Sequence, residues 1–266
     1  MESIAWNGRR IAYSQAGAGA PLVLVHGSLA TSACWRKVAA NLDGAPCRVL
    51  MPDLPGWGES EPPPADCRDL IEYEAAAIEA LAHDCAAPVH LAGHSHGGNI
   101  ALVMALGGRI PVRSLTLFEP VLCTLLSLTD PEPFKEISGF ANAYRSAFEA
   151  GDAWAVRKVI DLWGGAGSFD AMSEIARKAI FAWTAQNLRH WKDGFAYRID
   201  PEALRSLRVP TALVQSEHAH PIARLIVRRL HELIPRSRVV EMPAATHFMV
   251  LTHPAETARI LAESLQ

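Results

Sequence analysis

The stretch VHLAGHSHGG, residues 89–98, runs from apolar residues through a serine flanked by glycines. We expect a short buried strand that breaks at Ser95 into a helix, because residues 99–106 are good helix formers. Glycines two positions before and after the serine permit a very tight turn. Such a turn lifts the serine hydroxyl above the strand end, where the free N–H groups of the helix start also point. Alone, the pattern fits a nucleophile or an ordinary serine cap.

Length and charge indicate a compact globular chain. Its 266 residues are half apolar and carry a formal net charge of −3, which allows one domain, or one domain with an insertion. The small net charge argues against nucleic acid and membrane surfaces as main partners, because both attract a positively charged surface. The sequence has no leader-like start and no apolar run of about 20 residues, so it predicts a cytoplasmic protein. A small molecule is the expected partner. The sequence does not decide between a monomer and a homodimer.

Short apolar runs alternate with helical patterns along most of the chain. The dipeptide Asn7-Gly8 lies between two alternating segments and predicts an antiparallel hairpin at the start. Further apolar runs lie at residues 22–25, 48–51, 89–92, 115–118, 212–214 and 239–240. Because helices separate these runs, they predict a parallel sheet covered on both faces. Between Glu119 and Pro210 no buried strand is recognisable, and aromatic-rich helical patterns predict an inserted helical cap.

Four motifs follow the predicted strands in order. They are His26-Gly27, the D-x-P-G-x-G-x-S loop at residues 53–60, the G-x-S-x-G-G turn around Ser95, and a histidine in the last loop, His247. Together they resemble the α/β-hydrolase family over nearly the whole chain. The resemblance implies a mostly parallel, eight-stranded α/β sheet flanked by helices, with a helical cap after the sixth strand. We expect core segments at residues 1–120 and 196–266 and the cap at residues 121–195.

The resemblance also assigns roles to these residues. Acyl transfer needs an activated oxygen, a base, and donors for the oxyanion. Ser95 is the predicted nucleophile and His247 the predicted base. The backbone N–H groups of Ser28 and His96 are the implied oxyanion hole, with His26 orienting that loop.

The third member of the triad is displaced from its usual place. Relatives carry an acid after the seventh strand, but that slot here holds Ala219. We predict that Glu119 is the acid, because some α/β-hydrolases supply it from the end of the sixth strand and a glutamate is long enough to reach the imidazole. Glu217 is the alternative acid, and a dyad assisted by a backbone carbonyl or water is the third possibility.

The expected function is a serine hydrolase that cleaves small or medium carboxylic esters through an acyl-enzyme. No cofactor or metal is expected, because His218 and His220 lack a third ligand nearby and the five cysteines are scattered. A serine at the nucleophile position excludes the dehalogenase and epoxide-hydrolase branches of the family, for which the resemblance implies nucleophilic attack by an Asp. Carbon–carbon bond hydrolysis and perhydrolysis by a similar triad remain alternatives, as does a non-catalytic ligand-binding protein on this fold.

Overall fold

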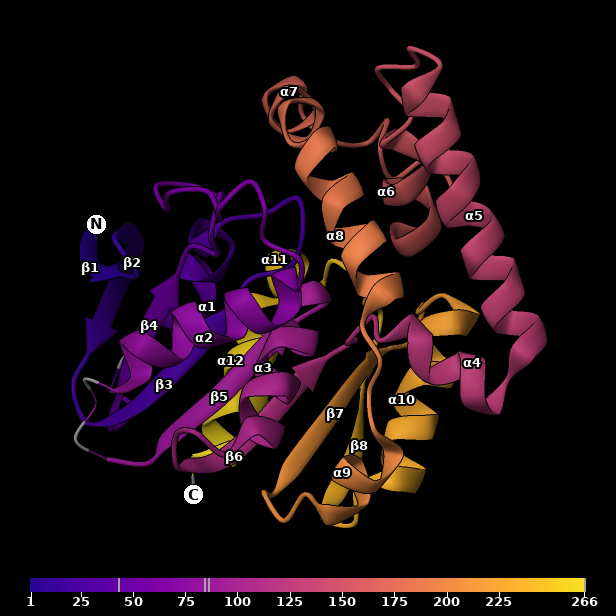
Figure 1. Ribbon diagram of the computed structural model, residues 1–266. Coiled ribbons are helices and arrows are strands. Elements are labelled where there is room, and N and C mark those ends of the chain that lie inside the picture. Colours follow the sequence, from indigo (N-terminus) through magenta and orange to yellow (C-terminus); the bar gives the residue numbers. More distant parts are fainter. Residues whose placement is uncertain (43, 84, 86, 266) are drawn as a thin grey trace.

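An eight-stranded, mostly parallel sheet forms the centre of the protein, as predicted (Figure 1). The computed structural model describes residues 1–42, 44–83, 85 and 87–265. The strands are β1 (Glu2–Trp6), β2 (Arg9–Gly17), β3 (Ala20–Val25), β4 (Cys47–Pro52), β5 (Val89–His94), β6 (Val112–Phe118), β7 (Thr211–Ser216) and β8 (Ser237–Met242). In space their order is β1-β2-β4-β3-β5-β6-β7-β8. Only the pairings of β2 with β1 and β4 are antiparallel, and the predicted hairpin turns at Asn7 and Gly8 with positive φ.

Helices cover both faces of this sheet. One face carries α2 (Leu70–His83), α3 (His96–Gly107) and α10 (Pro221–Leu233), and the other carries η1 (Ser32–Trp35), α1 (Arg36–Asn41) and α12 (Pro254–Ser264). Within β3, Val23 packs into the first layer and Leu24 into the second. Since successive side chains of a strand point to opposite faces, a strand buried on both faces is a continuous apolar run.

A helical insertion follows β6, as predicted. It starts with η2 (Cys123–Leu125) and α4 (Leu126–Thr129), and continues through α5 (Pro131–Glu149), α6 (Arg157–Gly164), α7 (Glu174–Ala182), α8 (Thr184–Ala196) and α9 (Pro201–Ser206). Figure 1 shows α5, α6, α7 and α8 grouped to one side of the sheet. The predicted cap at residues 121–195 ends one residue before α8 does, and its standing as a separate domain stays a prediction. Gln266 of the second core segment lies outside the described residues.

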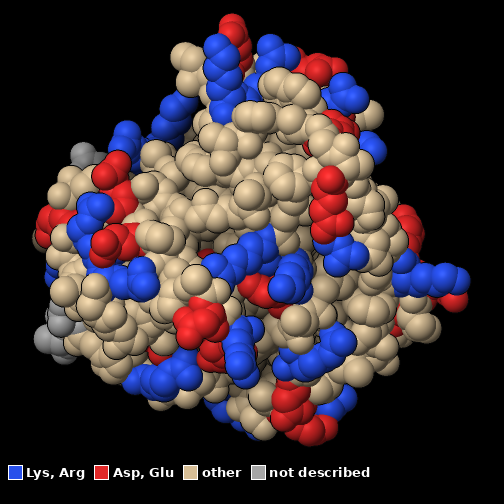
Figure 2. Space-filling view, turned by 45° about the horizontal axis from the view of Figure 1, so that its top comes forward, with Lys and Arg blue, Asp and Glu red and all other residues tan. Residues whose placement is uncertain are grey.

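Charged side chains of both signs are interspersed on the surface. Figure 2 shows Lys and Arg beside Asp and Glu, between broad uncharged areas. Many are paired, for example Arg229 with Asp130 at 2.7 Å and Arg224 with Glu241 at 3.0 Å. Within the described part of the chain, no helix is both long and apolar enough to cross a bilayer.

Candidate active site

Ser95 lies in a strained turn between β5 and α3. Its φ of 56° and ψ of −123° are values that non-glycine residues adopt only under local constraint. A Cβ atom on Gly93 would come within 2.1 Å of the Gly97 carbonyl oxygen. A Cβ atom on Gly97 would come within 2.4 Å of the His26 carbonyl oxygen. Both glycines are therefore required for the turn, which leaves the Ser95 side chain at the wall of a cavity.

The structure brings Glu119 and His247 together. The Nδ1–H group of His247 donates to Glu119 Oε2 at 2.7 Å, and the other carboxylate oxygen accepts from the backbone N–H of Ser216 at 2.7 Å and from its hydroxyl. Burial alone would raise the pKa of Glu119. Hydrogen bonds from His247 and Ser216 outweigh burial and lower that pKa below its ordinary value. A buried carboxylate is thus fixed behind the imidazole.

Glu217, the alternative acid, lies away from the imidazole. It is exposed, and its Oε2 accepts from the backbone N–H of Ala244 at 2.7 Å. That contact holds a residue with a positive φ of 55° in the loop before His247. Among the described residues, the carboxylate paired with His247 is that of Glu119.

Two neighbouring rings hold the His247 imidazole. Trp163 of α6 stacks on it with ring centroids 5.2 Å apart, and the ring of His94 lies 4.8 Å away. His94 Nε2–H also donates to the His247 carbonyl oxygen at 2.7 Å. No hydrogen bond joins Ser95 to His247 within the described residues, although both line the same cavity. Such contacts often tighten only when substrate binds.

Ser28 and His96, whose backbone N–H groups are the predicted oxyanion hole, both line this cavity. His96 is the first residue of α3, so its N–H is free of helical bonding. Neither N–H has a backbone acceptor among the described residues. His26 orients the Ser28 loop: Leu54 N–H donates to His26 Nε2 at 3.0 Å, so the ring proton is on Nδ1, which donates to the Gly27 carbonyl oxygen at 2.7 Å. Neither amide is therefore committed to a backbone partner within the described residues, as an oxyanion hole requires.

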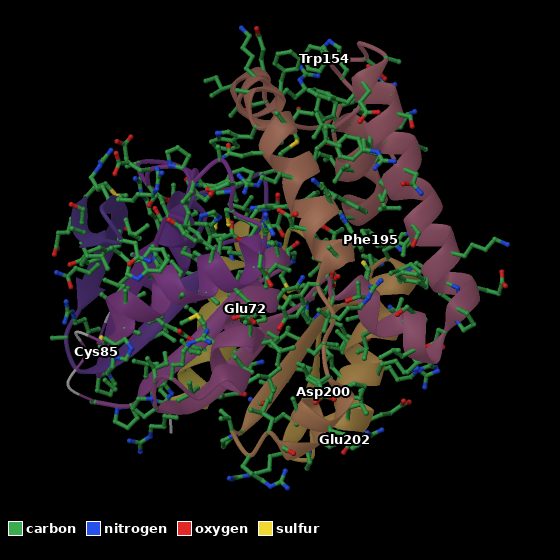
Figure 3. The ribbon with its side chains drawn as sticks, in the orientation of Figure 1. Glu72, Cys85, Trp154, Phe195, Asp200 and Glu202 are labelled. Carbon is green, nitrogen blue, oxygen red and sulfur yellow. The ribbon has the colours of Figure 1, made fainter. Side chains whose placement is uncertain are left out.

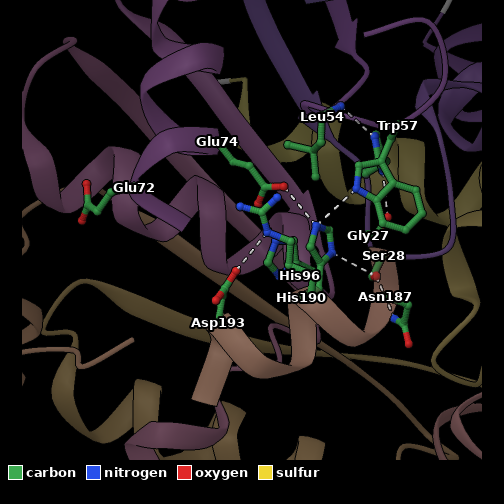
Figure 4. Close-up of polar contacts among 12 residues, drawn as sticks. Gly27, Ser28, Leu54, Trp57, Glu72, Glu74, His96, Asn187, His190 and Asp193 are labelled. Carbon is green, nitrogen blue, oxygen red and sulfur yellow. Dashed lines mark hydrogen bonds and ion pairs between the residues drawn. The ribbon is translucent and has the colours of Figure 1, made fainter. Parts of the chain in front are cut away.

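A second buried relay lies behind Ser28 (Figure 4). Glu74 of α2 accepts hydrogen bonds from His96 Nε2 at 2.7 Å and from His190 Nε2 at 3.0 Å. The Nδ1 atom of His190 lies 3.0 Å from Ser28 Oγ, to which Asn187 donates at 2.8 Å. Both His190 and Asn187 belong to α8, so the relay ties the insertion to the loop of the candidate oxyanion hole.

Sequence reasoning missed Glu74, Asn187 and His190. Glu74 and His190 are 116 positions apart, and no motif connects them. The available signal was the spacing of Asn187 and His190, which puts both on one face of a helix. Burial opposes ionisation of Glu74, but His190 and His96 lower its pKa to about 2, and burial lowers the pKa of His190 to about 4.

The relay places three potential metal ligands within 4.8 Å of one another: Glu74, His96 and His190. The rings of the two histidines are stacked, however, with centroids 3.8 Å apart and planes inclined by only 18°. A histidine lone pair lies in its ring plane, so an ion about 2.1 Å from both nitrogens would need to lie in both planes. The arrangement does not fit one ion held by both histidines, and the expectation of no metal stays a prediction.

The cavity beside Ser95 has a volume of about 410 Å³. Its wall is largely apolar and includes Trp163, Trp191, Phe195 and Phe248. Among the described residues, no Lys, Arg, Asp or Glu lines it. Figure 3 places Phe195 between α8 and α5 and Trp154 at the tip of the insertion. Trp154 does not line the cavity, so only some of the aromatic residues of the insertion do.

Acid should destabilise the fold through His94. This residue is buried, and burial together with His247 lowers its pKa from 6.5 to about 3, against the opposing charge of Glu119. Below pH 6.5 the unfolded chain therefore binds a proton that the native state does not. We expect His94 alone to reduce the free energy of unfolding by about 1 kcal/mol between pH 7.5 and 5.5.

Urea unfolding of the wild type and of His94→Gln at the two pH values measures this contribution. The variant should lose about that share of the pH dependence. His231→Gln, a change at an exposed histidine of α10, is the matched control and should retain it. Equal pH dependence in both variants would contradict the assignment.

Comparisons with known proteins identify related chains. The profile described as "Alpha/beta hydrolase family" matches residues 22–260. A soluble epoxide hydrolase of Corynebacterium sp. (strain C12) is 34% identical over 124 residues, which cover 43% of this chain and 40% of that protein. A 2-hydroxymuconate semialdehyde hydrolase of Pseudomonas sp. (strain CF600) is 38% identical over 117 residues, which cover 41% of this chain and 40% of that protein. The match thus spans about two fifths of these curated relatives.

The fold is also similar to solved structures. A thermophilic esterase from Thermogutta terrifontis superposes with a TM-score of 0.79 at 22% sequence identity. The superposition covers 100% of this chain and 98% of that one. Likeness at this level of identity concerns the fold alone.

Proposed function

Since the chain belongs to the alpha/beta hydrolase family, we propose that it is a serine hydrolase that cleaves small or medium neutral carboxylic esters. Ser95 is the nucleophile, His247 the base, and Glu119 the group that orients the imidazole. The backbone N–H groups of Ser28 and His96 hold the oxyanion. The observation that carries the proposal is the 2.7 Å hydrogen bond between His247 and a buried Glu119 at the cavity that Ser95 lines.

The reaction has two halves. Ser95 Oγ bonds to the ester carbonyl carbon while its proton moves to Nε2 of His247, the nitrogen that Glu119 leaves free. The tetrahedral intermediate collapses, the carbon–oxygen bond to the alcohol breaks, and the alcohol leaves with that proton. Water then attacks the acyl-enzyme with the same base, and the acid is released as Ser95 regains its proton.

The uncharged wall of the cavity favours neutral esters over keto acids. Burying a carboxylate without a cation costs several kcal/mol. No Lys or Arg of the described chain lines the cavity, and the carboxylate of Glu74 lies behind His190. The carbon–carbon bond hydrolase alternative, whose expected substrates are dienoic keto acids, therefore has less support than ester hydrolysis.

We predict that neutral acyl esters exceed anionic esters of the same length by at least about tenfold in kcat/KM. A chromogenic panel of graded chain length, with each neutral ester matched by one ending in a carboxylate, measures the ratio. Ionic strength is varied as a control, because surface attraction is screened by salt whereas the cost of burial is not. A kcat/KM that is tenfold higher for an anionic ester than for its neutral match would mean that a cation lines the site, and would favour the carbon–carbon bond hydrolase.

Covalent labelling separates an enzyme from a binding protein on the same fold. A fluorophosphonate should modify Ser95, because the reagent requires a serine that a base activates. An intact protein that binds apolar esters but remains unlabelled would be a ligand-binding protein.

A further inference from the structure

Trp163 of α6 lays the face of its indole ring against the His247 imidazole, yet the proposed mechanism gives this contact no part. The ring centroids are 5.2 Å apart and the two planes are inclined by 28°. The other tryptophan–histidine ring contacts among the described residues are tilted or edge-on, with planes inclined by 43° to 76°. Face-to-face stacking on tryptophan is therefore particular to the histidine that is the proposed base.

The proposed mechanism gives the His247 ring a positive charge twice. Its Nε2 takes a proton from Ser95 in the first half of the reaction and from water in the second. Its Nδ1 meanwhile keeps the proton that it donates to Glu119. The ring is therefore neutral before each half and becomes an imidazolium as the tetrahedral intermediate forms.

Few groups stabilise that charge. The Glu119 carboxylate pairs with one edge of the ring, at Nδ1. His94, the other ring beside it, is neutral at pH 7, because burial and His247 lower its pKa to about 3. Water contributes little, since His247 is 3% and Trp163 6% exposed. In such a dry setting, the negative face of a tryptophan within about 6 Å attracts a cation more strongly than it does in water.

We propose that Trp163 is a positioning residue that acts through His247, because the face of its indole stabilises the imidazolium that forms during ester hydrolysis. The inference rests on the proposed function, in which His247 is the base. A neutral imidazole gains much less from the same contact, so the stabilisation belongs to the transition state and raises kcat rather than lowering KM. Through α6, the insertion takes part in the chemistry of the core.

Fluorinated tryptophans at position 163 test the proposal while keeping the shape of the ring. Each fluorine atom withdraws electron density from the indole face and so weakens its attraction for a cation. Site-specific incorporation of tryptophans that carry one to four fluorine atoms gives a graded series. With one neutral ester, kcat should fall stepwise with the number of fluorine atoms, by roughly three- to thirtyfold over the series. KM should stay within about twofold of wild type.

The control is the same series at Trp35, a fully buried tryptophan that packs on Phe118 and does not line the cavity. There kcat should not follow the number of fluorine atoms. Melting temperatures of all proteins check that the fold is kept. A kcat that stays constant along the series at position 163 would overturn the proposal. If Trp163→Leu still lost activity in that case, the ring would only hold the imidazole in place.

Labelling separates failure of this inference from failure of the proposed function. If a fluorophosphonate labels Ser95 and the wild type hydrolyses the ester, but kcat ignores the fluorine atoms at position 163, the inference fails and the hydrolase proposal stands. An equal fall of kcat in both series would have the same meaning, because it would reflect a general effect of fluorine. If the wild type is neither labelled nor active, the hydrolase proposal fails and this inference fails with it.

Discussion

Ser95→Ala should lower kcat on a neutral ester by about a thousandfold or more while the protein stays folded. The change removes one oxygen atom from a side chain at the cavity wall. Alanine has no larger Cβ than serine, so the φ of 56° is no more strained than before. The loss should fall on kcat and kcat/KM together, because the missing oxygen forms its bond in the transition state and contributes little to ground-state binding.

Steady-state kinetics and thermal unfolding together measure this result. Ser138→Ala, a serine of α5 that bonds only to the backbone of its own helix, is the matched control and should behave as wild type. Fluorophosphonate labelling should disappear in Ser95→Ala and persist in the control. Activity within tenfold of wild type in the Ser95 variant would remove this serine from the mechanism.

Local patterns in the sequence were sufficient to predict the sheet and the serine turn. Glycines at 93 and 97 are required because a Cβ at either position would collide with backbone atoms, those of α3 in the first case and those at the end of β3 in the second. The position of Glu119 was predictable for a similar reason. It follows β6, next to β5 and β7, so it ends at the same edge of the sheet as Ser95.

The second relay depends on tertiary packing and could not be predicted in this way. Glu74 meets His190 only because α8 of the insertion packs against α2 of the core. The sequence gives no crossing point for two helices separated by more than a hundred residues.

Glu119→Gln should lower kcat by about a hundredfold or more, and Glu217→Gln should have little effect. Ser216 explains why the amide is so damaging. Its backbone N–H and hydroxyl both donate to Glu119 Oε1, so the oxygen of a glutamine must remain there. The NH₂ group then faces His247 Nδ1, which can only accept from it. The imidazole proton is forced onto Nε2, and a ring in that tautomer cannot take the proton of Ser95.

Glu217→Gln is the matched comparison for Glu119→Gln. Its carboxylate accepts from the Ala244 N–H in a loop and does not contact the imidazole, so a glutamine oxygen can replace it there. Kinetics of both variants on one neutral ester, with melting temperatures to exclude unfolding, measure the contrast. A large loss in Glu217→Gln with a small loss in Glu119→Gln would place the acid after β7. Two small losses would mean that His247 keeps its proton on Nδ1 without the Glu119 carboxylate, so that Ser95 and His247 act as a dyad.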